Sequence, residues 1–576
     1  MSEHHHPPLP FWRKYIFSTD HKVIGIQYGL TAMCFLFFGF LLVALMRFQL
    51  AYPGKALPII GGLFSETTMP GGVMLPEFYN QLGAMHGTIM VFLGIVPLAV
   101  GAFGNYVVPL QIGAPDMAFP KLNAASYWCF FAGGVVMLVS FFVPGGAANS
   151  GWTAYPPLSD IATTGQTFWL FAMVFLITSS LLGSVNFIVT IVQMRAKGLT
   201  WFRLPFFVWA QLVTAFLLLM AFPPLEAAAV LQLMDRLADT SFFLPTGLVV
   251  DGTPLQVSGD GSPLLWQHLF WFLAHPEVYV LILPALGIVA EIVANGSRKP
   301  LFGYKVMVYA VVTLGFLSFI VWAHHMFLTG MGTAISVFFQ TTTMIISIPS
   351  VILLSNLIIS LHGGSIRFTV PMLFALGFLP MFGIGGLTGL PLGLTATDIP
   401  LHDTYYVIGH FHYVVAPGTI IALFAGVYYW FPKITGRMMN KGLSYIHFWG
   451  TLIFMNLIFF PMLLQGLNGM SRRLYDGGHS YDYLEKAIGY NIPMFHSAMA
   501  LGVVQFVFFA NFWWSLFKGK KVENDNPWES TTLEWQTPTP PPHGNFTDEI
   551  VVYREAYEYS VPGVAQGYLP QNAKEA

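Results

Sequence analysis

The sequence predicts an all-α membrane protein built from twelve transmembrane helices. Hydrophobic residues make up 55% of the 576 positions and charged residues only 9%, whereas soluble proteins carry about 25% charged residues. Apolar runs of about 20 residues, long enough to cross roughly 30 Å of membrane hydrocarbon, recur along the chain. The net charge of −2 gives no sign of a nucleic-acid partner.

Twelve apolar runs carry this prediction, and one of them is irregular. The run at 369–391 contains many glycines and prolines, which interrupt a simple helical pattern. Many of the others are apolar on all sides, as expected for helices that contact both lipid and one another. The runs cover residues 23–48, 81–109, 124–145, 166–194, 204–234, 265–293, 304–327, 334–361, 369–391, 404–431, 444–468 and 494–517.

Basic residues give the orientation. With twelve spans, both termini and every second loop share one side of the membrane, and that side holds most of the 25 lysines and arginines. The positive-inside rule then places both termini in the cytoplasm and predicts a multi-pass protein of a bacterial inner (cytoplasmic) membrane. The opposite side holds only Arg47, Lys55, Arg236, Arg472, Arg473 and Lys486.

The chain divides into a membrane domain and a tail. Residues 1–521 carry all the apolar runs, and residues 522–576 are polar and proline-rich (TPTPPPHGNF). We expect an extended tail that covers the cytoplasmic face of the helices. The start of the chain lacks the short apolar core of a signal peptide, so the first span is expected to serve as its own insertion signal.

Six of the histidines inside the apolar runs define the candidate site. Burying an imidazole in a membrane is costly, and six of them require a shared reason, for which metal ligation is the obvious one. They are His86, His275, His324, His325, His410 and His412, in the segments LGAMHGTIM, AHPEVY, WAHHMF and GHFHYV.

His410 and His412 are two residues apart, which is about 200° of rotation on a helix. Their side chains leave opposite faces of the helix and cannot bind one metal, but they can bind two metals, as in a pair of haems placed for electron transfer. An isolated pair with this spacing usually reflects packing and a hydrogen bond, and it is the other histidine segments that favour ligation.

His324 and His325 are adjacent, about 100° apart on a helix, and can flank one metal between helices. His275 and Tyr279 are at i and i+4 on one helical face, which places a phenol beside a metal held by His275. Three neutral imidazoles leave an open position on copper, as a substrate oxygen requires. The cysteines, Cys34 and Cys129, lie in apolar sequence and are expected to be small buried packing residues.

These segments together resemble subunit I of the haem–copper oxygen reductases, and specifically a cytochrome c oxidase. The resemblance extends from STDHKVIG at 18–25 to NPWESTTLEW at 526–535. It implies the subunit I fold of that family and a respiratory-chain enzyme that reduces O2 to water with electrons from cytochrome c. It also implies that this reduction drives proton pumping across the membrane.

The resemblance also implies a ligand set. A low-spin haem would be held by His86 and His412, and His410 would be the axial ligand of the high-spin, oxygen-binding haem, both haems being of the A type. Copper B would be held by His275, His324 and His325. In the family the first of these histidines is covalently linked to its tyrosine, which implies a His275–Tyr279 bond, and the tyrosine supplies an electron and a proton.

Proton supply is a second requirement, because reducing oxygen inside a membrane consumes buried protons. The segment GNYVVPLQIGAPDMAFPKLN resembles the mouth of the family's D-pathway, where Asp116 would take up protons and Asn105 and Asn123 would order water. Glu277 would be the internal branching carboxylate. The alternatives are a loop cap for Asp116 and a structural role for Glu277.

Two positions depart from the family. In the second, K-type pathway a lysine follows a serine or threonine by three residues, but here Ser350 is followed by Leu353. Either Ser355 and Asn356 serve the second route or its protons enter differently. Glu226, in AFPPLEAAAV, stands where a small neutral residue is expected; it is either a hydrogen-bonded contact between helices or subunits, or part of an altered proton path.

The outer side carries further matches to the family. One arginine pair and a tryptophan resemble residues at the haem propionates, and another arginine resembles the partner of the low-spin haem's formyl group, unless it is an interfacial arginine. His402 and Asp403, with Asp398 nearby, match a redox-inactive magnesium site. The arginines and tryptophan are Arg472, Arg473, Trp152 and Arg47.

The resemblance also implies partners: subunit II with a two-copper centre, for which this chain has no cysteine pair, subunit III, cytochrome c or a cytochrome c domain, and a respiratory supercomplex. A quinol oxidase is the alternative, but its Arg, Asp and His near the first two helices are Phe38, Leu42 and Phe78 here. A nitric oxide reductase would lack Tyr279 and the D-pathway residues. A haem sensor or a proton-carrying transporter would not need all of the histidine segments together.

Overall fold

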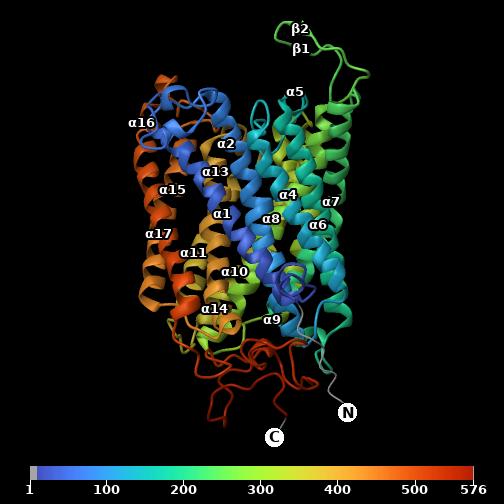
Figure 1. The fold of residues 1–576 in the computed structure, drawn as a ribbon, viewed down its shortest axis with the longest axis vertical. Helices are drawn as coiled ribbons and strands as arrows, with labels where there is room; N and C mark the ends of the chain where they lie inside the picture. The colour runs from blue at the N-terminus through green and yellow to red at the C-terminus, as the bar shows by residue number, and fades with distance from the viewer. Residues whose placement is uncertain (1–9, 575–576) are drawn as a thin grey trace.

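The computed structural model describes residues 10–574, and twelve membrane-length helical spans stand side by side within this part of the chain (Figure 1). The twelve predicted spans are therefore confirmed. Seven of them are single α-helices, α1 (His21–Ala51), α6 (Thr164–Gln193), α7 (Phe206–Leu237), α8 (Pro263–Ser297), α10 (Thr333–Leu361), α11 (Val370–Leu392) and α15 (Lys441–Leu467).

The other five spans change their winding or carry a short helix at one end. The second is α2 (Pro76–Thr88), two π-helical segments (Ile89–Ile95, Pro97–Ala102) and α3 (Phe103–Ile112); the third is α4 (Pro120–Val139) with a 3₁₀ turn (Ser140–Phe142). The seventh is α9 (Tyr304–Leu317) with 3₁₀ segments Ser318–Ile320 and Trp322–Thr329. The tenth is α13 (Tyr405–Val414), a π-helical segment (Val415–Ile420) and α14 (Ile421–Thr435), and the twelfth is α17 (Asn491–Lys518) after a 3₁₀ turn (Asp482–Leu484) and α16 (Glu485–Ile488).

The loops hold the remaining short elements. These are the π-helical turn Trp12–Ile16, the 3₁₀ turns Gly61–Leu63, Pro70–Gly72, Trp201–Arg203 and Leu533–Trp535, and the helices α5 (Leu158–Ile161) and α12 (Thr395–Leu401). A hairpin of β1 (Val249–Val250) and β2 (Thr253–Pro254) projects beyond the bundle (Figure 1). Asp251 and Gly252 at its tip both have positive φ, as a type I′ turn requires.

Changes of winding occur next to the histidines. π-helical turns follow His86 in the second span and His412 in the tenth, and both contain a proline, Pro97 and Pro417, that cannot donate a backbone hydrogen bond. Such wide turns are frequent at functional sites. In the seventh span, where the apolar run suggests one helix over 304–327, α9 ends at Leu317 and a 3₁₀ segment carries the remaining residues.

Helix α8 lies at the centre of the bundle. It packs against α7, α9, α10, α11 and α14, and almost all of its residues from Leu273 onward are buried. Helices such as α10 and α15 lie at the perimeter, where large apolar side chains are exposed as they would be to lipid or another subunit. The prediction that both cysteines are buried is wrong, because Cys34 is exposed and Cys129 is half-buried. A small apolar side chain can remain at the perimeter of the bundle, since the membrane around it is also apolar.

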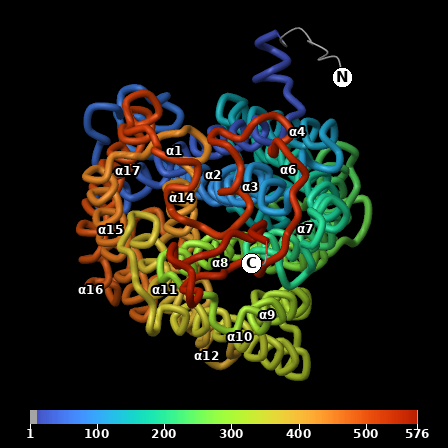
Figure 2. The backbone as a smooth tube through the Cα atoms, turned by 90° about the horizontal axis from the view of Figure 1, so that it is seen from below, coloured from blue at the N-terminus to red at the C-terminus, as the bar shows by residue number. Residues whose placement is uncertain are grey.

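The tail is a packed part of the structure. Its described residues cross the same end of the bundle as the start of α1, which we call the inner end (Figures 1 and 2). Glu534 and Trp535 are buried, and the buried ammonium of Lys433 donates to the backbone oxygen of Thr537 and to Thr539 Oγ1, both at 2.7 Å. The tail, which was predicted to cover one face of the bundle, makes specific contacts with the ends of the helices.

Docking of the tail is expected to weaken as the pH rises. Burial raises the pKa of Glu534, whose Oε1 accepts a hydrogen bond from Gln111 Nε2 at 3.1 Å. Because the docked state favours the protonated carboxyl, this contribution is complete below the ordinary carboxyl pKa of about 4.3 and is lost as the pH passes the raised value. Limited proteolysis at a series of pH values measures it.

Because this contribution falls as the pH rises above the ordinary carboxyl pKa of about 4.3, we expect the wild-type tail to be cut faster at the higher of two pH values above it, about 5 and about 9. In the Glu534→Gln variant the side chain stays neutral, so the difference between the two pH values should shrink. Equal cutting rates for the wild-type tail at both pH values would contradict this prediction.

Candidate active site

All six histidines predicted as metal ligands line one cavity inside the bundle. The cavity has a volume of about 910 Å³ and is bounded by residues of α1, α2, α8, α10, α11, α13 and α17 and of the 3₁₀ segment after α9. Predicted residues from separate parts of the sequence therefore share one internal space, which is large enough for bulky cofactors.

His275, His324 and His325 converge at one side of this cavity. His325 Nε2 lies 3.1 Å from His324 Nε2 and 3.3 Å from His275 Nδ1, and one ligand atom of each lies within 4.8 Å of the others. Nitrogens that each lie about 2.0 Å from a common metal are separated by about 3 Å, which agrees with these distances. Without a metal between them, neutral imidazoles whose lone pairs face each other would repel. The three side chains fit a metal that prefers imidazole, such as copper.

The surroundings fix the orientation of these rings. His324 Nδ1 donates to Thr343 Oγ1 at 2.8 Å, which leaves Nε2 directed at the cluster. His325 stacks on Trp271, with ring centroids 3.7 Å apart and planes 12° from parallel. Neither Thr343 nor Trp271 was predicted from the sequence; the only signals were a threonine run, 341–343, in an apolar helix and a tryptophan one turn before His275.

Tyr279 and Glu277 both line the cavity, from different sides of α8. The Tyr279 ring lies beside His275, with centroids 4.9 Å apart, and His275 Nε2 has no hydrogen-bond partner in the described part of the chain. Glu277 is 2% exposed, and neither carboxylate oxygen has a partner among residues 10–574. A buried carboxyl without a partner is expensive to retain unless it has a function.

His86, His410 and His412 are held in the same manner. In each ring Nδ1 donates to a backbone oxygen, and Nε2 is left for a metal. The distances are 2.8 Å to the Gly39 oxygen for His86, 2.9 Å to the Gly385 oxygen for His410 and 2.8 Å to the Ile408 oxygen for His412. Such histidines fit the axial ligands of haem iron.

The structure places His410 and His412 on opposite sides of α13. The His412 ring stacks on Phe459 at a centroid distance of 4.6 Å. The His410 ring lies against α11, where Thr388 Oγ1 is 3.2 Å from Nδ1 and a Cβ added to Gly389 would meet the ring at 2.7 Å. The glycine-rich sequence of α11 thus allows the close approach of His410, and Thr388 is a contact that was not predicted from the sequence.

At the outer end, polar residues form one group at the edge of the cavity. Arg472 forms an ion pair with Asp403, and the His402 ring nitrogens lie 3.5 Å from the Asp398 carboxylate and 3.9 Å from that of Asp403. Arg47 is buried rather than interfacial, and its Nη1 has no partner in the part of the chain that the structure describes. The cavity wall here includes Arg47, Trp152, Asp398, His402, Asp403, Arg472 and Arg473.

At the inner end, Asp116 lies in the loop between α3 and α4. Its Oδ1 accepts a hydrogen bond from the backbone N–H of Met117 at 2.6 Å, and burial raises its pKa. Asn123, on α4, is buried, and both of its side-chain polar atoms are unpartnered within residues 10–574. A carboxyl with a raised pKa can take up and release protons nearer to neutral pH than an exposed one.

A second, smaller cavity of about 40 Å³ lies on this side and is lined by Asn105. This volume exceeds the roughly 10–15 Å³ that one water needs, and six of the lining residues carry polar side-chain groups that could bind it. The other polar residues here were not predicted, although serines at 179, 180 and 184 in an apolar helix were a usable signal. They are Tyr28, Ser126, Ser179, Ser180 and Ser184.

The structure also shows the surroundings of the two positions that depart from the family pattern, Leu353 and Glu226. Ser350 lines the large cavity, whereas Leu353 is fully buried in packed side chains. Glu226 is half-buried on α7, accepts a hydrogen bond from Thr178 Oγ1 of α6 at 2.8 Å, and lines neither cavity. These contacts favour the structural interpretation of Glu226 over a proton path.

Comparison with known proteins agrees with this arrangement. The sequence model of the family described as "Cytochrome C and Quinol oxidase polypeptide I" matches residues 23–504. The alternative cytochrome c oxidase subunit 1 of Bradyrhizobium diazoefficiens is 45% identical over 98% of this chain and 94% of its own length. Cytochrome c oxidase subunit 1 of Synechocystis is 44% identical over 96% and 94% of the two chains.

The fold has a counterpart among solved structures. A cryo-EM structure of a haem–copper terminal oxidase dimer matches with a TM-score of 0.69 at 22% identity, covering 87% of this chain and 85% of that one. At this identity the likeness concerns the fold alone, whereas the family match extends over most of the sequence. The chain therefore belongs to the cytochrome c and quinol oxidase polypeptide I family.

Proposed function

We propose that this protein is the catalytic subunit of a cytochrome c oxidase, which reduces O2 to water with electrons from cytochrome c and moves protons across the membrane. The observation that carries the proposal is the cluster of His275, His324 and His325, which shares one cavity with His410 and Tyr279. An open metal position, a haem ligand and a phenol at one place are what oxygen reduction requires.

The histidines divide between three metal sites in this proposal. His275, His324 and His325 hold copper B, and His410 holds the high-spin haem. His86 and His412 hold the low-spin haem, and both haems are of the A type. When bound, these groups carry electrons to oxygen and bind it. The apolar walls of the cavity exclude bulk water from the reaction.

The chain's own residues supply protons. Asp116 takes them up at the inner surface, and Asn105 and Asn123 orient water that carries them inward. Glu277 holds a proton in the cavity and passes it either to the reaction or toward the outer side. Tyr279 donates the proton of its phenol beside His275 and is reprotonated from the cavity. The closeness of the two rings, together with a His275 Nε2 that has no hydrogen-bond partner within residues 10–574, is compatible with a covalent bond between them.

Outer residues complete the assignment. Arg472, Arg473 and Trp152 would hold haem propionates, Arg47 would hold the formyl group of the low-spin haem, and His402 and Asp403 would hold magnesium. Arginines form strong ion pairs with carboxylates such as the haem propionates. Magnesium prefers oxygen ligands, so a site made of one carboxylate and one imidazole should bind it less tightly than a site made of oxygens alone.

Partners supply what the chain lacks. Subunit II carries the two-copper centre, subunit III packs on the perimeter, and cytochrome c or a cytochrome c domain is the donor within a respiratory supercomplex. In a bacterial inner membrane the inner end of the bundle faces the cytoplasm. Phe38, Leu42 and Phe78 are half-buried or buried apolar side chains, which favours cytochrome c over a quinol that needs polar partners.

Optical spectroscopy of the purified complex tests the proposal. The reduced protein should show two haems, only one of which changes its spectrum on addition of carbon monoxide, with copper bound and oxygen consumed when reduced cytochrome c is supplied. A single haem, or two haems that both ignore carbon monoxide, would exclude an oxidase of this type.

Adding one methyl group at Gly389 is expected to disturb the high-spin haem alone. In the Gly389→Ala variant the new Cβ would stand 2.7 Å from the His410 ring, so the ring must move and carbon monoxide binding should fall by about 10- to 100-fold. Gly383→Ala, on the same helix, is the matched control because Gly383 does not line the cavity and a Cβ there meets only Leu354, at an ordinary contact distance of 3.6 Å. Normal carbon monoxide binding in Gly389→Ala would contradict the assignment of His410 to the oxygen-binding haem.

A further inference from the structure

Protons must cross from the inner end of the bundle to the large cavity, and α10 is one of the helices that connect the two. Ser347 and Ser350 of this helix line the cavity. Beyond Ser350, toward the inner end, the same face of α10 carries only leucines, since positions three, four, seven and eleven further on lie within about 60° of it. They are Leu353, Leu354, Leu357 and Leu361.

These leucines close the face of α10. Leu353 and Leu357 are completely buried, and the other two are half-buried against the core. The next polar side chains are on other faces: Ser355 is turned by about 140° from Ser350, and Asn356 lies about 9 Å further along the axis and is turned by about 120°. A single water bridges about 5–6 Å between hydrogen-bonding groups, so these groups do not extend the polar surface of the cavity.

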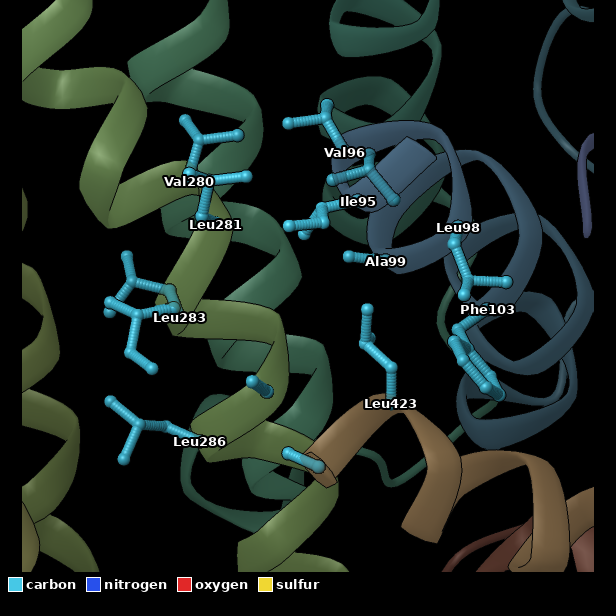
Figure 3. Packing of buried hydrophobic residues seen from close by; sticks show 14 of the residues in the cluster. Ile95, Val96, Leu98, Ala99, Phe103, Val280, Leu281, Leu283, Leu286 and Leu423 are labelled. Carbon is cyan, nitrogen blue, oxygen red and sulfur yellow. The ribbon is translucent and has the colours of Figure 1, made fainter. Parts of the chain in front are cut away.

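Helix α8 offers no polar side chain in the same direction, although Leu281, Ile282 and Leu286 still line the large cavity. From Val280 to Ala290 every side chain is apolar, and the largest exposed fraction among the buried ones is 3%, at Ile282. Figure 3 shows Val280, Leu281, Leu283 and Leu286 packed in this stretch, with Leu423 of α14 nearby. The first polar residue is Glu291, about 8 Å along the helix beyond Leu286, the last α8 residue that lines the cavity. Its carboxylate accepts hydrogen bonds from the Tyr557 hydroxyl of the tail at 2.6 Å and from the Phe207 N–H at 3.1 Å.

The Asp116 side is different. Helix α3 leads from the loop of Asp116 to Asn105, which lines the small cavity together with Tyr28, four serines and apolar side chains. The second span separates the two spaces by a single layer, because Val96 and Pro97 line the small cavity and their neighbours Ile95 and Leu98 line the large one. Within residues 10–574, polar side chains thus approach the large cavity from the inner end on this side and are interrupted by leucine on the α10 side.

We infer that the Asp116 inlet is the single proton entrance of this oxidase, serving both the reduction of its oxygen-binding site and the later reaction with oxygen, because the α10 face is sealed by leucine. The inference rests on the proposed oxidase function. Each proton delivered to the large cavity is replaced by one taken from water at the inner surface through Asp116, and no second stream supplies the site along α10.

Two half-reactions of the intact multi-subunit complex test this inference. One is the anaerobic reduction of the carbon-monoxide-binding haem by excess reductant, and the other is the re-oxidation of the reduced complex by O2. Asp116→Asn should slow both by about 100-fold, since removing a proton-transferring carboxyl costs about 10²- to 10⁴-fold. Asp116→Glu, which keeps a carboxyl, should recover most of both rates.

Ser355→Ala and Asn356→Leu are the matched variants for the α10 side, and both should keep each rate within about twofold of the wild type, because neither side chain lines the cavity. An unchanged low-spin haem spectrum establishes folding in every variant. Anaerobic reduction at the wild-type rate in Asp116→Asn, or a slow one in Asn356→Leu, would overturn the single entrance. A wild-type complex without an oxygen-reactive haem would instead overturn the proposed function on which it rests.

Discussion

Replacing His324 with asparagine is expected to abolish oxygen consumption while leaving the low-spin haem intact. His324 Nε2 lies 3.1 Å from His325 Nε2 in the three-histidine cluster, so the variant loses one of three nitrogens that would hold copper. Loss of an outer contact to a metal ligand already costs about 10- to 100-fold, and the loss of a ligand should cost at least about 100-fold in turnover. Oxygen uptake, copper content and the haem spectrum measure these three properties separately.

The control for this variant is His268→Asn, which makes the same substitution at an exposed histidine on α8 that does not line the cavity. Its copper content and turnover should equal those of the wild type. If His324→Asn retained full copper and full oxygen uptake, the three-histidine cluster would not be the site of oxygen chemistry.

Replacing Glu277 with glutamine is expected to lower turnover by about 10²- to 10⁴-fold, the usual contribution of a positioned proton-transfer group. The carboxyl is buried beside the cavity without a hydrogen-bond partner among the described residues, so the amide keeps the shape of the side chain but removes the transferable proton. Steady-state oxygen uptake and proton release in proteoliposomes measure the effect.

Glu226→Gln is the matched control, because it makes the same change at another glutamate in a membrane-spanning helix, the one that departs from the family pattern. Glu226 bonds to Thr178 between α6 and α7 and lines neither cavity, so turnover should stay within about twofold of the wild type. The opposite result, with Glu277→Gln active and Glu226→Gln inactive, would move the proton path to Glu226.

The spans and the histidines were predictable because both leave strong local signals. A run of about 20 apolar residues is rare outside membrane-spanning helices, and the spacing of His410 and His412 places them on opposite faces of any helix. The side-chain periodicity likewise placed Tyr279 beside His275.

Other features depend on tertiary contacts and leave no such signal. The 3₁₀ segment that turns His324 and His325 toward α8 interrupts an apolar run that suggests a continuous helix. Thr343, Trp271 and Thr388 each contact a predicted histidine ligand that lies on another segment of the chain, and the sequence does not reveal such contacts. The composition of the tail is polar and proline-rich, which predicts only an extended segment. The burial of Glu534 involves a hydrogen bond with Gln111, more than 400 residues away in the sequence.

Proton release during oxygen reduction is the most direct test of the proposed redox-driven proton pump. The complex is reconstituted in proteoliposomes, supplied with reduced cytochrome c and oxygen, and the outer pH is followed in the presence of a charge-equilibrating ionophore. We expect consumption of O2 together with acidification of the outer medium, both lost in Asp116→Asn. Oxygen consumption without acidification, or turnover that survives in Asp116→Asn, would contradict the pump and its Asp116 entrance.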